Sequence, residues 1–352
     1  VDGGESWRNL VELGQAVSVR DVKVDTSTSR DIVFAATEVG LFRSADEGVT
    51  YTEVPTFTGQ SVWSIVKTSA GWLVSAQPCP TAGTAGLQCP SATTLYLTTD
   101  LGVTWTVIPN PGNVFSNNGR TTLGVASPGE SIVYAFSSTV GDAAMRDVYR
   151  SGDGGKTWVA NGVNATKVPT NPVPGNMANM NICQSQCWYD QMLLVDPRDA
   201  TRNTVWIGGT LAAAQTTNGG ATWTLKTWWL YNQVPGLPYA HTDHHAAVFK
   251  GTGTPTIILG NDGGLNVTTD DGATFSSAKN RGLETFLFYT ISGSRDFPSL
   301  VIAGSQDNGT RLRVGGSNIY NQVIGGDGMG TAYSRDNTNT VIGSAQGSSM
   351  RT

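Results

Sequence analysis

Three histidines, the only ones in the 352-residue chain, lie within five positions of one another in the segment His241-Thr-Asp243-His244-His245. In an extended chain alternate side chains share a face, so we expect His241, Asp243 and His245 together and His244 opposite. Two imidazoles and a carboxylate on one surface suit a bound divalent metal ion or a proton relay. The alternative is a hydrogen-bonded His–Asp cluster that closes a strand.

Acidic residues recur where inner strands are predicted to start and in the turns between the second and third strands. The strand-start acids are Asp190, Asp243 and Asp327. The turn acids are Glu38, Asp262 and Asp307. Carboxylates that converge on one opening suit general acid–base catalysis or a cation. The alternative is that each one caps its own glycine-rich turn.

Aromatic residues gather near the same acids in the sequence: Trp188, Tyr189, Trp228, Trp229, Tyr231 and Tyr239. Exposed aromatic rings beside carboxylates are typical of sugar-binding clefts, where the acids bind hydroxyl groups or cleave the linkage. The alternative is packing of the loops, since Trp is usually buried. We predict catalytic roles for Asp262, Asp243, Asp327 and Asp307. The aromatic set, with Asp190 and Glu38, is predicted to bind substrate.

A repeated turn must position these residues. Its pattern, Ser/Thr-x-Asp-x-Gly-x-Thr-aromatic, has its acid at Asp46, Asp100, Asp153 and Asp270, with Asn218 in the same place and a shortened copy at Asp2. The Asp can accept backbone N–H bonds within the turn, and the Gly supplies backbone freedom. The closing aromatic residue starts the next strand and packs between sheets. These aspartates are therefore predicted to be structural.

The spacing of the repeat predicts the architecture. Successive copies lie roughly 50 residues apart, the length of a four-stranded propeller blade. The strand pattern that precedes the turn also recurs at Val301 and Val341, but neither copy is followed by the turn. If Thr352 is placed before Val1, the two ends together spell a complete copy of the turn that closes at Trp7. We predict an all-β fold in which residues 1–352 form a single seven-bladed β-propeller, its last blade closed by the N-terminal strand. The alternative is a fragment of a longer tandem-propeller protein.

The repeated turn resembles the Asp box, or BNR repeat, of secreted bacterial propellers related to the sortilin-type propeller. A narrower resemblance is to the family 74 glycoside hydrolases, which cleave xyloglucan. Asn261-Asp262-Gly263-Gly264 resembles the context of their catalytic acids, and so does Thr37-Glu38-Val39-Gly40, with Glu in place of Asp. That family builds its cleft between two propellers, whereas this sequence predicts one.

Cysteine positions and charge limit the compartment and the partners. Cys79 with Cys89 and Cys183 with Cys187 are predicted to form two local disulfides, which indicates an oxidising compartment. The net charge of −5 and the absence of basic clusters argue against a nucleic-acid partner. No apolar run is long enough to span a bilayer. We therefore predict a secreted or cell-surface protein.

Two functions follow from these features. The first is a glycoside hydrolase-like protein that acts on or binds an extracellular polysaccharide, which as an enzyme would cleave a neutral glycan. The second is a non-catalytic propeller that binds a protein or peptide, or serves as a cell-surface scaffold. A divalent cation is the one cofactor that the residues suggest.

Overall fold

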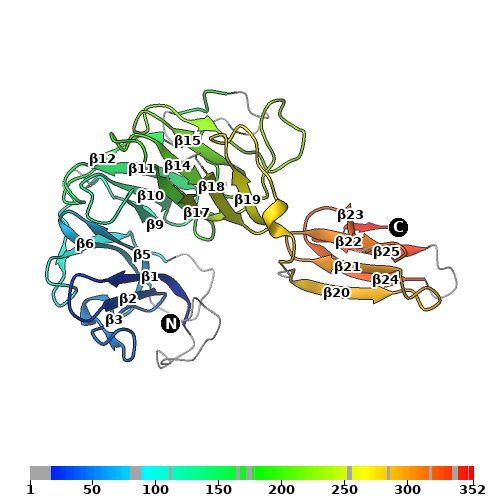
Figure 1. The fold of residues 1–352 in the computed structure, drawn as a ribbon, viewed down its shortest axis with the longest axis horizontal. Coiled ribbons are helices and arrows are strands. Elements are labelled where there is room, and N and C mark those ends of the chain that lie inside the picture. The colour runs from blue at the N-terminus through cyan, green and yellow to red at the C-terminus, as the bar shows by residue number, and fades with distance from the viewer. Residues whose placement is uncertain are drawn as a thin grey trace. The chain divides into compact units, whose positions relative to one another are not determined.

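The computed structural model describes residues 17–79, 89–110, 113–163, 167–171, 177, 179–251, 256–283, 286–316, 319–334, 340–347 and 349–352. In this part of the chain every element with defined bounds is a β-strand, apart from two short 3-10 helices, η1 (Pro55–Phe57) and η3 (Ala278–Asn280). The described strands form seven antiparallel sheets in chain order (Figure 1). The all-β prediction is confirmed.

The first four sheets have four strands each and cover the first two-thirds of the chain. The first contains β1 (Val19–Asp25), β2 (Ile32–Thr37), β3 (Leu41–Ser44) and β4 (Thr52–Glu53). The second contains β5 (Gln60–Thr68), β6 (Gly71–Pro78), β7 (Thr94–Thr98) and β8 (Thr106–Val107). The third contains β9 (Asn118–Gly124), β10 (Val133–Thr139), β11 (Met145–Ser151) and β12 (Val159–Ala160). The fourth contains β13 (Met192–Val195), β14 (Val205–Gly208), β15 (Ala213–Thr216) and β16 (Thr224–Leu225).

Three sheets complete the described chain. The fifth contains β17 (His244–Lys250), β18 (Thr256–Asn261) and β19 (Gly264–Thr268). The sixth contains β20 (Phe288–Gly293), β21 (Val301–Ser305), β22 (Gly309–Arg313) and β23 (Asn321–Ile324). The seventh contains β24 (Gly328–Tyr333), β25 (Val341–Ala345) and β26 (Ser349–Arg351).

The chain divides into two compact units. Unit 1 consists of Val1–Leu259 and Val267–Phe275, and unit 2 consists of Gly260–Asn266 and Ser276–Thr352. Within unit 1 the first strand of each sheet contacts the first strand of the next, from β1 through β5, β9 and β13 to β17. Within unit 2, β20 and β24 are in contact in the same way. Consecutive sheets therefore meet along their first strands within each unit.

Burial explains the strand patterns. All six residues of β2 are buried because this strand is covered on both faces, whereas β1 alternates between exposed and covered side chains. Unit 1 holds large apolar clusters around residues such as Trp223 and Phe34. The buried apolar residues described in unit 2 are Ile302, Ala303 and Ile324. Most of the buried apolar area therefore lies in unit 1.

The repeated turn joins the third and fourth strands of a sheet, as between β3 and β4. In the first copy Asp46 accepts hydrogen bonds from the Thr50 backbone N–H (2.8 Å), the Thr50 hydroxyl (2.6 Å) and the Ser44 hydroxyl (2.7 Å). The Ser44 hydroxyl oxygen in turn accepts from the Gly48 N–H (2.8 Å). These bonds, led by those from Thr50, lower the pKa of Asp46 to about 2. The carboxylate is thus used within its own turn.

The glycine of the turn also lets neighbouring sheets approach. At Gly102 φ is +83°, and an added Cβ would lie 2.5 Å from Phe34 Cε1 of the preceding sheet. The aromatic residue that closes this turn, Trp105, packs edge-on against Phe57 with ring centroids 5.2 Å apart. This copy of the turn therefore helps to join its sheet to the one before it.

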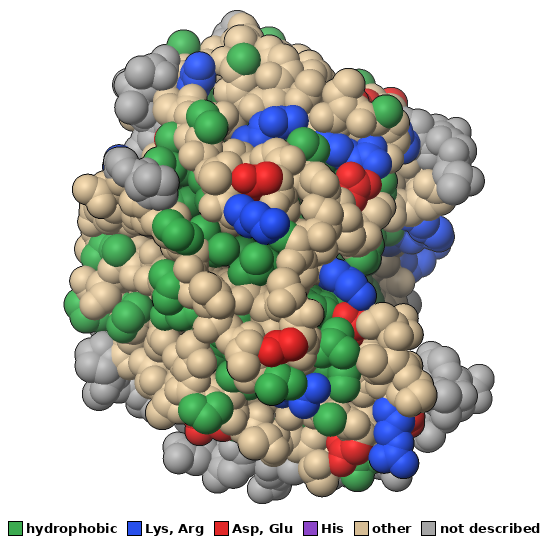
Figure 2. All heavy atoms as spheres, turned by 90° about the vertical axis from the view of Figure 1, so that its left-hand side faces the viewer, with side chains coloured by type: hydrophobic (Ala, Val, Ile, Leu, Met, Phe, Trp, Pro, Cys, Tyr) green, Lys and Arg blue, Asp and Glu red, His purple; other side chains and the backbone are tan. Residues whose placement is uncertain are grey.

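The two predicted disulfides, Cys79–Cys89 and Cys183–Cys187, are present, with Cα–Cα distances of 4.9 and 5.1 Å. Within the described residues, no helix is both long and apolar enough to cross a membrane. The face drawn in Figure 2 carries Lys and Arg side chains interspersed with Asp and Glu. The predicted closing strand near Trp7 lies outside the described residues.

Candidate functional site

The first strands of unit 1 bring charged and aromatic side chains from separate sheets into one row. Arg20 lies near the start of β1, Trp63 in β5 and Arg120 near the start of β9. Asp190 lies two residues before β13, and Asp243 lies directly before β17. Because these strands are neighbours in this order, residues far apart in sequence become adjacent. We call this set the inner-strand row.

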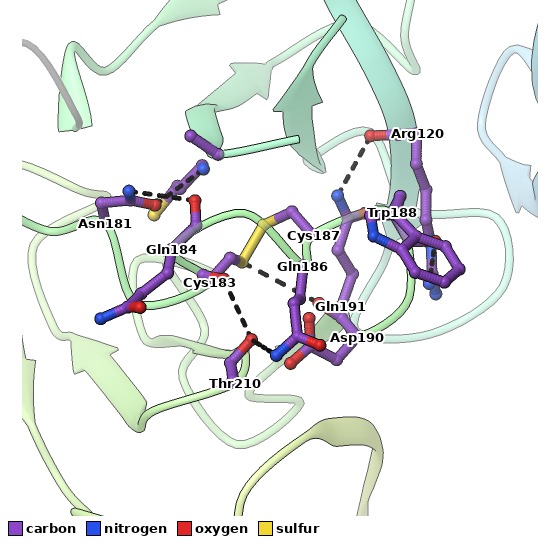
Figure 3. The surroundings of a disulfide bond; sticks show 12 residues. Arg120, Asn181, Cys183, Gln184, Gln186, Cys187, Trp188, Asp190, Gln191 and Thr210 are labelled. Atoms are coloured by element: carbon purple, nitrogen blue, oxygen red, sulfur yellow. Dashed lines mark hydrogen bonds between the residues drawn. A yellow bond between two sulfur atoms is a disulfide. The ribbon is translucent and has the colours of Figure 1, made fainter. Parts of the chain in front are cut away.

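The segment that carries Asp190 is held by a disulfide and a short set of hydrogen bonds (Figure 3). The Thr210 hydroxyl donates to the Cys183 carbonyl (3.0 Å), and the Gln186 amide donates to the Thr210 hydroxyl oxygen (3.5 Å). The Asp190 backbone N–H donates to the Gln186 carbonyl (3.0 Å). The backbone on both sides of the Asp190 carboxyl is therefore fixed.

Asp190 is the most unusual acid of the described chain. It is completely buried, and neither carboxyl oxygen has a hydrogen-bond partner. Burial raises its pKa to about 9, and the neighbouring Asp243 acts in the same direction through its charge and a carboxyl contact. The Thr210 hydroxyl and the Arg120 charge oppose the rise, but neither completes a hydrogen bond to this carboxyl. Asp190 is thus a neutral acid at pH 7.

Asp243 lies across Thr210 from Asp190. Its backbone N–H donates to the Thr210 carbonyl (3.1 Å), and only 8% of the residue is exposed. Its φ of +62° places a non-glycine residue in the left-handed region, where the cost must be offset by the surrounding structure. Asp190 and Asp243 form a carboxyl pair in which two negative charges cannot both be maintained.

The histidine segment differs from the extended chain that the sequence suggested. Strand β17 begins only at His244, and the left-handed Asp243 precedes it, so alternation does not place His241, Asp243 and His245 on one face. Among the described residues these three do not form a group of ligand atoms close enough to hold one metal ion. His245 instead packs against the Tyr189 ring, with centroids 4.8 Å apart.

His244 is fully buried, and neither ring nitrogen has a hydrogen-bond partner. Burial, with smaller effects of His245 and His241, lowers its pKa to about 3. The ring is therefore neutral at pH 7. Its Cβ lies against Gly208, where an added Cβ would come within 2.7 Å. His244 therefore packs in the interior of unit 1, and it directly follows Asp243 of the carboxyl pair in the sequence.

Three other predicted acids form a connected group in unit 2. Asp262 lies between β18 and β19, Asp307 between β21 and β22, and Asp327 just before β24. The Asp307 N–H donates to Asp327 Oδ1 (2.8 Å), and the Asn308 amide donates to the Asp262 carbonyl (3.1 Å). All three acids are partly exposed. The sequence repeat predicted that these acids, which come from three sheets, would lie at the same end of the sheets. Hydrogen bonds connect their segments in the structure.

The predicted aromatic surface is only partly available. Trp228 is 3% exposed and Trp229 is partly buried, and both pack into the large cluster of unit 1. The prediction that Trp228 faces a ligand is therefore wrong, because the interior of unit 1 covers its ring. Tyr189, Tyr231 and Tyr239 are exposed, at 38, 73 and 40%.

Trp188 and Glu38 have different contacts within unit 1. Trp188 helps to line a small cavity with Trp63, Gln77 and Arg120. Glu38, in the turn between β2 and β3, accepts a hydrogen bond from the Ser18 N–H (3.1 Å) and so ties down the chain that leads into β1.

Sequence reasoning overlooked the two arginines of the inner-strand row. The Arg20 guanidinium carbon lies 3.4 Å from the centroid of a Trp63 ring, and that of Arg120 lies 5.5 Å from it. The available signal was their position, because both fall near the start of a first strand, as the predicted acids do.

Comparison with known proteins gives no family membership. No family model matches the chain. A xyloglucanase of Hypocrea jecorina (strain QM6a) is 31% identical over 109 residues, which are 30% of this chain and 12% of that protein. The chain therefore matches a small part of this curated relative.

Two solved structures align with most of the chain at low sequence identity. YCF48 from Cyanidioschyzon merolae is 12% identical, with 95% of this chain and 94% of that chain covered and a TM-score of 0.48. The GH74 xyloglucanase from Xanthomonas campestris is 15% identical, with 93% and 53% covered and a TM-score of 0.41.

Proposed function

We propose that the chain is a secreted, glycoside hydrolase-like Asp-box β-propeller that acts on or binds an extracellular polysaccharide. The observation that carries this proposal is the buried carboxyl pair Asp190–Asp243. Glycoside hydrolysis needs one carboxyl that is protonated and one that is ionised, and unequal environments are how proteins separate these two roles. The exposed Tyr189 ring next to the pair supports a sugar ligand.

The two members of the pair have different parts in this proposal. Asp190 has no exposed surface, so it is a positioning residue that keeps a proton and shares it with Asp243. Asp243 is the member of the pair with exposed surface, which suits a general base or a nucleophile. Asp262, Asp307 and Asp327 of unit 2 are proposed as catalytic acids in their own right.

The proposal extends to the architecture and the compartment. The seven sheets are assigned as seven blades of a single propeller over residues 1–352, closed by the N-terminal strand. The contacts between successive first strands within each unit support this assignment. The two disulfides support an oxidising, extracellular compartment. The curated match to a xyloglucanase supports a glycan as the ligand.

The test is the release of reducing ends from xyloglucan and a panel of β-glucans. We expect turnover by the wild type and a loss of about 100-fold or more in Asp243→Asn and Asp262→Asn. Asp296→Asn, at an exposed position, is the matched control and should retain activity. Absence of turnover on every glycan, with binding retained, would remove the hydrolase and leave a binding protein.

A second function, a non-catalytic propeller that binds a cell-surface protein or peptide, is favoured by a groove in unit 2. This groove has a volume of about 450 Å³ and is lined by Phe286, Phe288, Ile291, Ala303, Arg311 and Tyr320. Phe286 and Phe288 stack with centroids 5.9 Å apart, and Arg311 lies over Phe286. An apolar groove with one cationic residue suits an apolar peptide side chain.

Selection from a peptide library against the whole chain tests this second function. We expect the selected peptides to lose binding to Phe288→Ser and to retain binding to the control Phe297→Ser, which changes an exposed phenylalanine outside the groove.

A further inference from the structure

Two guanidinium groups approach the same tryptophan from different sheets. Arg20 of β1 lies 3.4 Å from the Trp63 ring centroid, and Arg120 of β9 lies 5.5 Å from it. Trp63 is fixed between them because its Nε1–H donates to Gln77 Oε1 (3.0 Å). The Gln77 amide is itself held by the Ser91 carbonyl (2.7 Å). A fixed indole therefore holds guanidinium groups from two other sheets close to one ring.

Neither cation is neutralised by an ion pair. Within the described chain, no carboxylate oxygen lies within ion-pair distance of Arg20 or Arg120. Arg120 uses its Nη1 on the carbonyls of Trp188 (3.2 Å) and Tyr189. The Nη1 of Arg20 is buried and has no hydrogen-bond partner. A buried donor left unpaired costs free energy, which a ligand acceptor can recover.

The electrostatics agree with this geometry. Burial lowers the pKa of Arg20 to about 9, and repulsion by Arg120 contributes, with Glu38 opposing. Burial lowers the pKa of Arg120 to about 10, with Asp190 opposing. Both groups remain cationic at pH 7. An anion bound by both would relieve the repulsion.

We propose that Arg20 and Arg120 form a binding site for a carboxylate, and that the ligand is a uronic acid unit of an acidic polysaccharide. A guanidinium stacked on an indole keeps its N–H groups directed outward in the plane, in the fork that matches a carboxylate. The adjoining Trp188 and the exposed Tyr189 offer ring faces for a sugar. The choice of a sugar rests on the proposed function, whereas the carboxylate site does not.

Calorimetric titration of the whole chain with trigalacturonate tests the site, and its methyl ester is the neutral control. We expect the acid to bind at least about tenfold more tightly than the ester, and the difference to shrink as salt is raised. Arg20→Gln should lose about tenfold or more, and Arg30→Gln, which changes an exposed arginine of the same unit, should behave as wild type. Because Arg20→Gln loses the stacking contact with Trp63, circular dichroism checks that this variant is folded under the titration conditions.

Equal affinity for acid and ester, or no effect of Arg20→Gln, would overturn the site. Binding of a tetraglutamate peptide but not of trigalacturonate would overturn the sugar ligand and indicate an acidic protein. Binding of trigalacturonate by a chain that hydrolyses no glycan would support the site while removing the hydrolase. The two proposals therefore fail separately.

Discussion

Aspartates at the two ends of the sheets have opposite tendencies to hold a proton. In the turn between β3 and β4, the bonds from Thr50 and Ser44 lower the pKa of Asp46 to about 2. At the start of β13, Asp190 is buried without a hydrogen-bond partner, and its pKa is raised to about 9. An aspartate carboxyl therefore has several hydrogen-bond donors in the turn and none at the start of β13. The unsatisfied region is where a role beyond folding should be sought.

The largest expected effect comes from Asp190→Asn. The unfolded chain releases this proton near pH 4 and the folded chain keeps it up to about pH 9, so the wild type loses stability as pH rises through that window. The amide does not titrate, so the variant should be more stable at pH 7, by roughly 4 kcal/mol. Urea denaturation at pH 5 and pH 8 measures the difference, which should grow with pH. A constant difference would mean that Asp190 is ionised in the folded protein.

An intermediate effect is expected when the disulfide beside Asp190 is removed. Replacing Cys183 and Cys187 by serine should cost about 2 kcal/mol from loop entropy. The substitution should also narrow the pH window over which Asp190 lowers the stability, because the segment that buries the carboxyl is released and the pKa of Asp190 falls. Serine replacement of Cys79 and Cys89 is the matched control, with a similar cost but no change in that window. Denaturation over a pH series measures both quantities, and an unchanged window in the first variant would show that the sheets alone bury Asp190.

The smallest effect is expected in the repeated turn. Although burial acts to raise the pKa of Asp153, bonds from Thr157 and Ser151 lower it to about 2, so its stabilisation is present above pH 4 and is lost as pH falls toward 2. Asp153→Ala should cost about 1 kcal/mol at pH 7. Asp153→Asn should be close to wild type, because Asn218 keeps two bonds to Thr222 in its own turn: it accepts from the Thr222 N–H (2.9 Å), and its amide donates to the Thr222 hydroxyl oxygen (2.8 Å). Thermal denaturation of the three proteins provides the measurement, and an equal loss in both variants would show that the charge is required.

Much of the scaffold was predictable because it depends on local chemistry. The hydrogen bonds of the repeated turn lie within five residues, so the pattern around Asp46 predicts them directly. The disulfide partners are close in sequence, and their pairing was predicted correctly. Asp262 and Asp307 could be aligned because each lies in the turn between the second and third strands of its repeat, although the bond from the Asp307 N–H to Asp327 links separate sheets.

The remaining features depend on contacts between distant segments. Trp228 was predicted to be exposed from its place in a loop, but its burial is decided by the cluster around Trp223. The histidine segment looked extended, but the left-handed Asp243 breaks the alternation. The pairing of Arg20 with Arg120 joins residues 100 positions apart, and no local pattern indicates it.

The sequence by itself determined the all-β class, the turn that repeats and the two disulfides, because each depends on residues that are neighbours along the chain. Only the tertiary structure decided the protonation of Asp190 and the proximity of the arginines at Trp63. Desolvation and charge act through space, so these properties depend on which first strands become neighbours and on what covers their ends.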